Sequence, residues 1–104
     1  SNSVNNSRAS ILGGYYNLNS ALNAVILTGQ ANRILSNAAA GSILGGANNF
    51  VSEAYSSVSG GWDNEAAGLW SVVSGGVNNT TTGDYSVVSG GEGNVATGEA
   101  EQVP

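Results

Sequence analysis

The sequence contains no histidine and no cysteine. The chain therefore lacks the side chains that most nucleophilic and general-base sites use, and both disulfides and thiolate metal sites are excluded. Seven carboxylates remain, but they are scattered, and only Asp84 and Glu99 share a position in the repeat described below. We therefore expect no catalytic residues, no metal site and no cofactor, and a protein that is not an enzyme.

Positive charge and long apolar segments are also scarce. Two arginines stand against seven acidic residues, which gives a formal net charge of −5. Such a chain offers no basic patch to a nucleic-acid backbone or an anionic lipid surface. No segment approaches the roughly 20 apolar residues that cross a bilayer. We expect neither nucleic-acid binding nor direct membrane insertion.

Large core-forming side chains are few. There is one phenylalanine and no methionine, whereas glycine occurs 16 times and serine and asparagine are abundant. This composition fits either a disordered chain or a repetitive scaffold in which small residues recur because stacking requires them. The periodicity of the sequence decides between the two.

A glycine recurs at spacings of 16, 16, 15, 15 and 15 residues. We centre six repeats, or rungs, on these glycines, which are Gly13, Gly29, Gly45, Gly60, Gly75 and Gly90. Repeats this short are typical of solenoids, in which stacked rungs together bury side chains that one rung alone leaves exposed. The pattern predicts a single repeat domain over residues 1–104, an all-β solenoid with two short strands per rung.

The residue types at two columns of the repeat are explained by stacking of the rungs. The position two before each glycine is always aliphatic and holds Ile11, Leu27, Ile43, Val58, Val73 and Val88. The position four after it is asparagine in five rungs, namely Asn17, Asn49, Asn64, Asn79 and Asn94, and is Arg33 in the second rung. Stacked aliphatic side chains form a continuous seam, while asparagine tolerates the left-handed conformation and hydrogen-bonds to asparagines above and below.

Both ends of the chain fall inside a rung. We expect either that the chain belongs to a longer one or that a different element docks at each end. Pro104 has no amide hydrogen and would stop the strand ladder.

A rung of two strands encloses a thin core, so we expect stability to require association between chains. The first candidate interface is the column five places after the glycine in the early rungs, formed by Leu18, Ile34 and Phe50. The second is an aromatic column, Tyr55, Trp70 and Tyr85, whose rings we expect to stack from rung to rung.

Three segments carry a resemblance to a known family. SVSGG at 57–61 and SVVSGG at 71–76 and 86–91 are each followed by asparagine and a corner of small residues and glycine. They resemble the head repeats of trimeric autotransporter adhesins, and similar repeats occur in tail-fibre and other structural proteins of bacteriophages. The resemblance implies a left-handed parallel β-roll, a homotrimer, and an extracellular location on a bacterial surface or on a virion.

Together these features predict a structural segment of a fibre, acting as a rigid rod or head for surface display, host attachment or adhesion. A receptor would be a glycan or a protein on the host surface, and the candidate contact residues at the corners are Tyr15, Tyr16 and Trp62. The alternative is a monomeric solenoid with a flat face that binds carbohydrate or ice. Such a face needs a threonine pair on every rung, and only Thr80 and Thr82 provide one.

Overall fold

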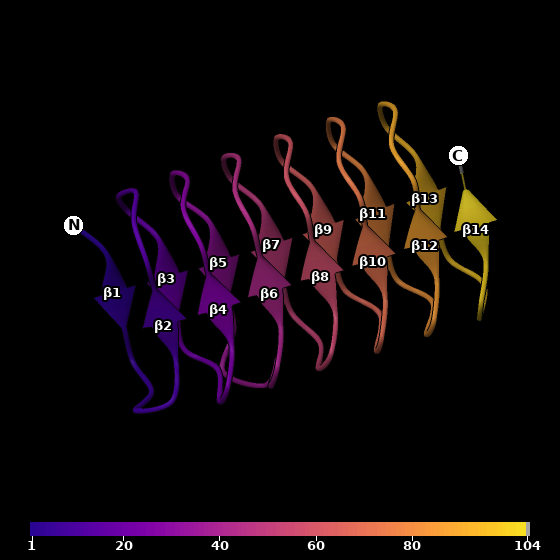
Figure 1. The fold of residues 1–104 in the computed structure, drawn as a ribbon. Helices are drawn as coiled ribbons and strands as arrows, with labels where there is room; N and C mark the ends of the chain where they lie inside the picture. Colours follow the sequence, from indigo (N-terminus) through magenta and orange to yellow (C-terminus); the bar gives the residue numbers. More distant parts are fainter. Residues whose placement is uncertain (104) are drawn as a thin grey trace.

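The computed structural model describes residues 1–103 as a parallel β-solenoid (Figure 1). Each rung contributes one two-residue strand to each of two seven-stranded sheets. This confirms the all-β solenoid with two short strands per rung, although there are about seven rungs and not six, because the partial rungs at both ends also pair. Pro104, which we expected to stop the ladder, lies outside the described residues.

The odd-numbered strands form one sheet, which we call the odd-strand sheet. Its members are β1 (Ser3–Val4), β3 (Leu18–Asn19), β5 (Arg33–Ile34), β7 (Phe50–Val51), β9 (Glu65–Ala66), β11 (Thr80–Thr81) and β13 (Val95–Ala96). The even-numbered strands form the even-strand sheet. Its members are β2 (Ser10–Ile11), β4 (Val25–Ile26), β6 (Ser42–Ile43), β8 (Ser57–Val58), β10 (Val72–Val73), β12 (Val87–Val88) and β14 (Gln102–Val103).

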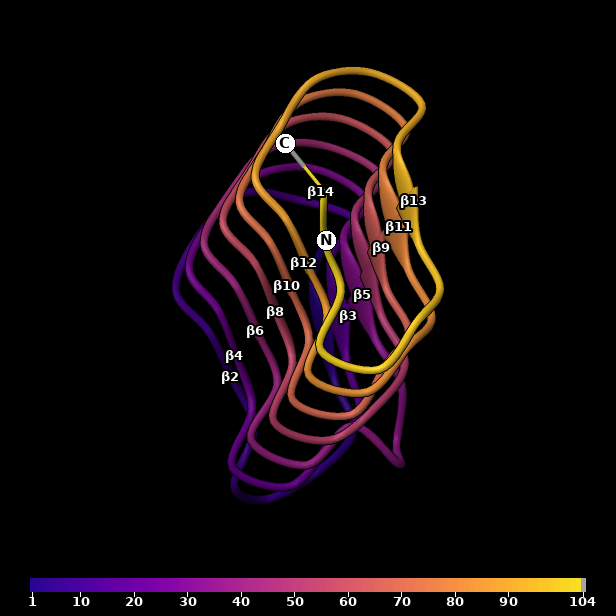
Figure 2. The same ribbon diagram turned by 90° about the vertical axis from the view of Figure 1, so that its right-hand side faces the viewer.

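The two sheets face each other and are joined by two kinds of corner (Figure 2). The glycine corners lead from an even strand to the next odd strand and cover 12–17, 27–32, 44–49, 59–64, 74–79 and 89–94. The aromatic corners lead back and cover 5–9, 20–24, 35–41, 52–56, 67–71, 82–86 and 97–101. The Cα extents are 33 × 21 × 12 Å, and the longest agrees with about seven rungs stacked at ~4.8 Å. Within residues 1–103 there is no helix long and apolar enough to cross a membrane.

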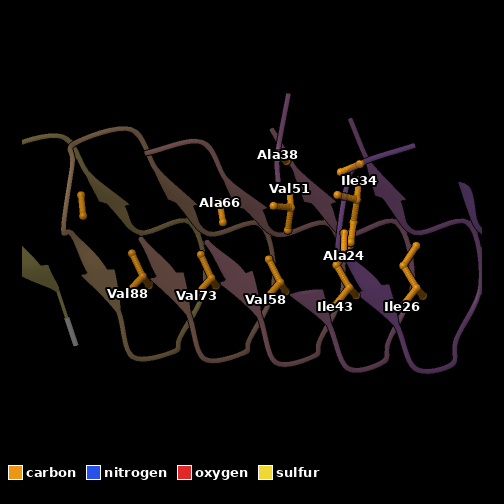
Figure 3. Packing of buried hydrophobic residues seen from close by; sticks show 12 residues of the cluster. Ala24, Ile26, Ile34, Ala38, Ile43, Val51, Val58, Ala66, Val73 and Val88 are labelled. Atoms are coloured by element: carbon orange, nitrogen blue, oxygen red, sulfur yellow. The ribbon is translucent and has the colours of Figure 1, made fainter. Parts of the chain in front are cut away.

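The core is two facing rows of aliphatic side chains, one from each sheet (Figure 3). Successive strand residues point to opposite faces, so each two-residue strand gives one side chain to the core and one to the outer face. The even-strand sheet supplies Ile26, Ile43, Val58, Val73 and Val88, all fully buried, with Ile11 partly buried at one end. The odd-strand sheet supplies Ile34, Val51, Ala66 and Ala96, and the same row contains two fully buried polar side chains, Asn19 and Thr81. The core is therefore one layer thick.

The second rung lies one residue away from the register that the glycine spacing predicted. Ile26, not Leu27, pairs with Ile11 and Ile43, and the Leu27 side chain is 41% exposed. In the same way Asn32 takes the asparagine position in place of Arg33. Because side chains alternate along a strand, a slip of one residue exchanges the inner and outer faces.

The same slip moves Ile34 from the expected interface to the core, where it is fully buried. Gly29 corresponds to Gly14 and Gly46, so the first two intervals are 15 and 17 residues long. The two additional residues are accommodated in the corner at 35–41, which projects from the stack in Figure 2.

The second glycine of each pair, and not the first, is the one that stacking requires. The six residues at this position have positive φ, and they are Gly14, Gly29, Gly46, Gly61, Gly76 and Gly91. A Cβ on Gly61 would lie 2.2 Å from the carbonyl oxygen of Gly76 in the next rung. A Cβ on Gly60 would meet nothing within 4 Å. Thr28, which occupies the first position in the second rung, shows that a side chain fits there.

A ladder of asparagines runs beside these glycines. The Asn64 side chain is typical: its Nδ2 donates to the Gly60 oxygen at 2.9 Å and to the Gly76 oxygen at 3.0 Å, and its Oδ1 accepts from the Asn79 amide at 2.9 Å. The asparagines in this ladder are Asn17, Asn32, Asn49, Asn64, Asn79 and Asn94, and all but the last are buried. Each amide therefore joins its own corner to the following rung.

Gly61→Ala and Gly60→Ala form a matched test of the glycine column. Gly61→Ala places a methyl group against backbone at positive φ, so we expect a loss of about 3 kcal/mol or more in the free energy of unfolding. Gly60→Ala should change it by less than about 0.5 kcal/mol. Urea denaturation followed by circular dichroism measures both, and equal losses would contradict the assignment of the second glycine as the stacking position.

Asn64→Asp tests the asparagine ladder without changing side-chain size. In the variant, a carboxylate oxygen replaces the amide nitrogen that donates to two carbonyl oxygens. Because burial and repulsion by these oxygens disfavour the ionised form, the pKa of the new carboxyl is raised in the folded state. We expect the free energy of unfolding to fall by about 3 kcal/mol at pH 7. Because the penalty belongs to the ionised form, it is present above the unfolded pKa of about 4 and is relieved as the pH falls through the raised folded value.

The control is Asn78→Asp, one column away on the exposed corner, where Asp63 occupies the same position in the preceding rung. Its unfolding free energy should change by less than about 0.5 kcal/mol at either pH. Denaturation at pH 7 and pH 4 compares the two variants, and a pH-independent loss in Asn64→Asp would contradict the role of the amide donors.

Candidate functional site

Charged side chains are distributed unequally over the solenoid. Five lie in the aromatic corners, namely Arg8, Glu53, Asp84, Glu99 and Glu101. Two lie in the glycine corners, Asp63 and Glu92, and two on the outer face of the odd-strand sheet, Arg33 and Glu65. The outer face of the even-strand sheet has none of them. This face is therefore the one that loses least electrostatic hydration when it is covered.

The outer face of the even-strand sheet is built of small or aliphatic residues, apart from Gln102 at one end. Its first column consists of Ser10, Val25, Ser42, Ser57, Val72, Val87 and Gln102. Its second column consists of Leu12, Leu27, Leu44, Ser59, Ser74 and Ser89. The three leucines are exposed, at 67%, 41% and 47% of their surface. We call this surface the uncharged face.

The outer face of the odd-strand sheet contains a shallow open groove of about 400 Å³ beside the glycine corners. One wall is the outward column of β5, β7, β9 and β11, with Arg33, Phe50, Glu65 and Thr80. The other is the exposed positive-φ column of the corners, which includes Asp63 and Asn78. The Arg33 guanidinium carbon lies 5.1 Å from the centre of the Phe50 ring. Phe50 belongs to a column predicted from the sequence as a candidate interface, and no sequence pattern indicated the groove.

The aromatic column lies in the corners that lead from an odd strand to the next even strand. Tyr55, Trp70 and Tyr85 are about half exposed and have φ of 60°, 60° and 61°. Bulky side chains are uncommon in this left-handed region, where the chain elsewhere uses Asn23, Ala40 and Ala100. Tyr55 and Trp70 stack with ring centroids 4.3 Å apart and planes 7° apart. Each ring therefore covers one face of the other, and both side chains are still about half exposed.

The other candidate contact residues lie in the glycine corners. Tyr15 and Tyr16 are exposed and meet edge to face, with ring centroids 5.8 Å apart. Trp62 is also exposed, in the same ladder as Tyr15 but three rungs away. The structure therefore does not bring Trp62 together with the tyrosines into one aromatic surface.

The titratable groups form no cluster. Within the described part of the chain, no three acidic side chains come close enough to hold a metal ion. The pKa of Glu101 is lowered because its carboxylate accepts hydrogen bonds from the backbone amides of Gly98, at 2.9 Å, and Thr97, at 2.8 Å. These hydrogen bonds join the two ends of the last aromatic corner, so Glu101 stabilises that corner locally.

Comparison with known proteins gives no family for this chain. No protein-family model matches the sequence, and no curated protein matches it. The fold described above therefore depends on the structure alone, and the resemblance of 57–61, 71–76 and 86–91 to adhesin head repeats remains an expectation from the sequence.

Trp70→Ala should destabilise the solenoid through loss of the stack with Tyr55. Alanine already occupies this corner position at Ala40 and Ala100, so the backbone conformation is preserved. We expect the free energy of unfolding to fall by about 1 kcal/mol, the usual value of an aromatic pair. Trp62→Ala, which removes an exposed ring of the same kind, is the control and should cost less than about 0.5 kcal/mol. Equal losses in chemical denaturation would show that the stack contributes nothing specific.

Proposed function

We propose that this chain is a rigid structural segment of a homotrimeric fibre, extracellular or part of a virion, that serves for surface display, host attachment or adhesion. The observation that supports it best is the uncharged face, which leaves one complete side of the solenoid without an ionisable group. In this proposal the three chains pack through that face around an axis parallel to the solenoid, and the segment has no catalytic task.

The thin core supports association. Each complete rung buries one side chain from each sheet, and the shortest Cα extent is only 12 Å. A single chain of this size has little apolar burial to offset its conformational entropy, and small scaffolds of this kind are commonly stabilised by disulfides, metals or oligomerisation. The chain has no cysteine for a disulfide, and residues 1–103 contain no group of three acidic side chains that could hold a metal ion, which favours association.

The size and chemistry of the uncharged face suit a protein interface. The Cα extents of 33 and 21 Å bound a face of roughly 700 Å², which two neighbouring chains would share in a trimer and which is somewhat smaller than the ~800 Å² that each partner contributes to a standard two-body interface. The centres of interfaces are depleted of charged residues. Leu12, Leu27 and Leu44 form an exposed apolar stripe along this face, and apolar stripes of this kind mark association sites.

Packing through the uncharged face directs the variable surfaces outward. The odd-strand sheet, the aromatic corners and the rest of the glycine corners beyond the uncharged face, with all nine charged side chains, would then face solvent and keep the fibre soluble. A solenoid whose rungs are tied by continuous hydrogen-bond ladders resists bending between neighbouring rungs. These properties suit a rod that positions other parts of a fibre or presents a contact surface.

The native mass tests the trimer. Native mass spectrometry and light scattering should find three times the 10.3 kDa of the chain. Val72→Lys places a charge in the middle of the uncharged face and should shift the particle toward monomer by at least tenfold in dissociation constant, because an unpaired charge is costly to bury.

Thr80→Lys is the matched control, since Thr80 occupies the equivalent outward position of the neighbouring strand β11 on the other sheet and is equally half-buried. It should leave the trimer intact. A well-folded monomer of the unaltered chain would contradict the fibre proposal and favour a solitary solenoid whose flat face binds carbohydrate or ice. Dissociation by Thr80→Lys but not by Val72→Lys would move the interface to the odd-strand sheet.

A further inference from the structure

The groove on the odd-strand sheet combines several kinds of binding group along one line. Phe50 is half-buried, so part of its ring is accessible, and the Arg33 guanidinium lies 5.1 Å from the ring centre. Glu65 and Thr80 continue the same column on the next two rungs. Asp63 and Asn78 form the opposite wall at positive φ of 60° and 59°. An apolar ring, a cation, carboxylates, an amide and a hydroxyl therefore border one open volume.

The two walls repeat with the rise of the solenoid. Neighbouring rungs present equivalent positions about 4.8 Å apart, so Asp63 and Asn78 on one wall, and Glu65 and Thr80 on the other, form two parallel rows. A linear ligand with regularly spaced polar groups matches this arrangement, whereas a compact ligand would contact only one rung. An extended chain of pyranose units has such a spacing, and each unit has hydroxyl edges and an apolar face of C–H groups.

Charge restricts the choice of ligand. Two carboxylates, Asp63 and Glu65, disfavour phosphate and acidic sugars, and their positions do not form part of any three-carboxylate metal cluster within residues 1–103. Arg33, at the opposite end of the groove from Thr80, disfavours a polycationic peptide. Neutral hydroxyl groups both donate to carboxylates and accept from guanidinium and amide groups, so they are compatible with every polar group here.

We infer that this groove binds a neutral oligosaccharide that lies along the solenoid axis. The part of the Phe50 ring that Arg33 leaves uncovered contacts C–H groups of one sugar unit. Asp63 and Glu65 accept hydrogen bonds from sugar hydroxyls, and Arg33, Asn78 and Thr80 donate to ring and hydroxyl oxygens. The inference rests on the proposed function in one respect, because packing through the uncharged face leaves the odd-strand sheet free for a ligand.

The test uses the full chain against a panel of neutral oligosaccharides of four to six units, built from glucose, galactose, mannose or N-acetylglucosamine, with sialylated counterparts. Array binding identifies a ligand, and titration calorimetry measures its affinity. We expect a neutral member to bind at least tenfold more tightly than its sialylated counterpart. Phe50→Ala and Asp63→Asn should each weaken that binding at least tenfold.

Two features keep the variants interpretable. Asp63→Asn is compatible with the fold, because Asn48 and Asn78 occupy the same corner position in the neighbouring rungs. Val95→Ala shortens an exposed apolar side chain in the same outward column, beyond the groove, and should leave binding unchanged. Absence of binding by every neutral member would overturn the inference, as would binding that survives both groove variants or that is lost in Val95→Ala.

Native mass measured on the same samples separates the two proposals. A trimer that binds no neutral oligosaccharide overturns the inference of oligosaccharide binding and leaves the fibre proposal in place. A monomer that binds a neutral oligosaccharide through Phe50 and Asp63 overturns the fibre proposal and leaves the inference of oligosaccharide binding in place.

Discussion

The structure depends on the contact between a buried asparagine amide and the glycine of the next rung. In every rung before the last, the amide satisfies the carbonyl of its own corner, the carbonyl of the following glycine and the backbone N–H of the following asparagine, as the 2.9–3.0 Å bonds of Asn64 illustrate. Such a network in a water-poor interior strengthens each bond and penalises any missing member. Because a Cβ on Gly61 would meet the next backbone at 2.2 Å, the same contact also fixes how closely rungs approach.

This constraint divides the rung into a fixed and a free part. The asparagine, the second glycine and one inward side chain per strand recur because stacking fails without them. Outward positions lie outside this backbone contact, so they vary from Arg33 to Phe50 to Glu65 in one column while the strand pairing is kept. Solenoids use such free positions for recognition. The absence of charge from one outer face is then meaningful, since the fold itself does not require it.

The regular rungs could be predicted from the sequence, and the irregular one could not. In the last three rungs the SVSGG and SVVSGG units fix both columns. In the second rung Gly29 was aligned with the first glycine of each pair, although its positive φ places it with the second. Counting three residues from the second glycine to asparagine would have selected Asn32 and, with it, Ile26 and Ile34. The groove depends on side chains from four rungs, so no local pattern indicated it.

The two halves of the solenoid reach stability by different means. The early rungs fill the core with isoleucine at 26, 34 and 43, whereas the later rungs use valine facing alanine, as with Val73 and Ala66. Less apolar volume is buried there, and the later corners are tighter, since a Cβ on Gly68 would lie 2.1 Å from the Gly83 oxygen. Trp70 stacks on Tyr55 across these corners despite the strain of its left-handed backbone. The stack thus adds contacts outside the core in the rungs that bury less within it.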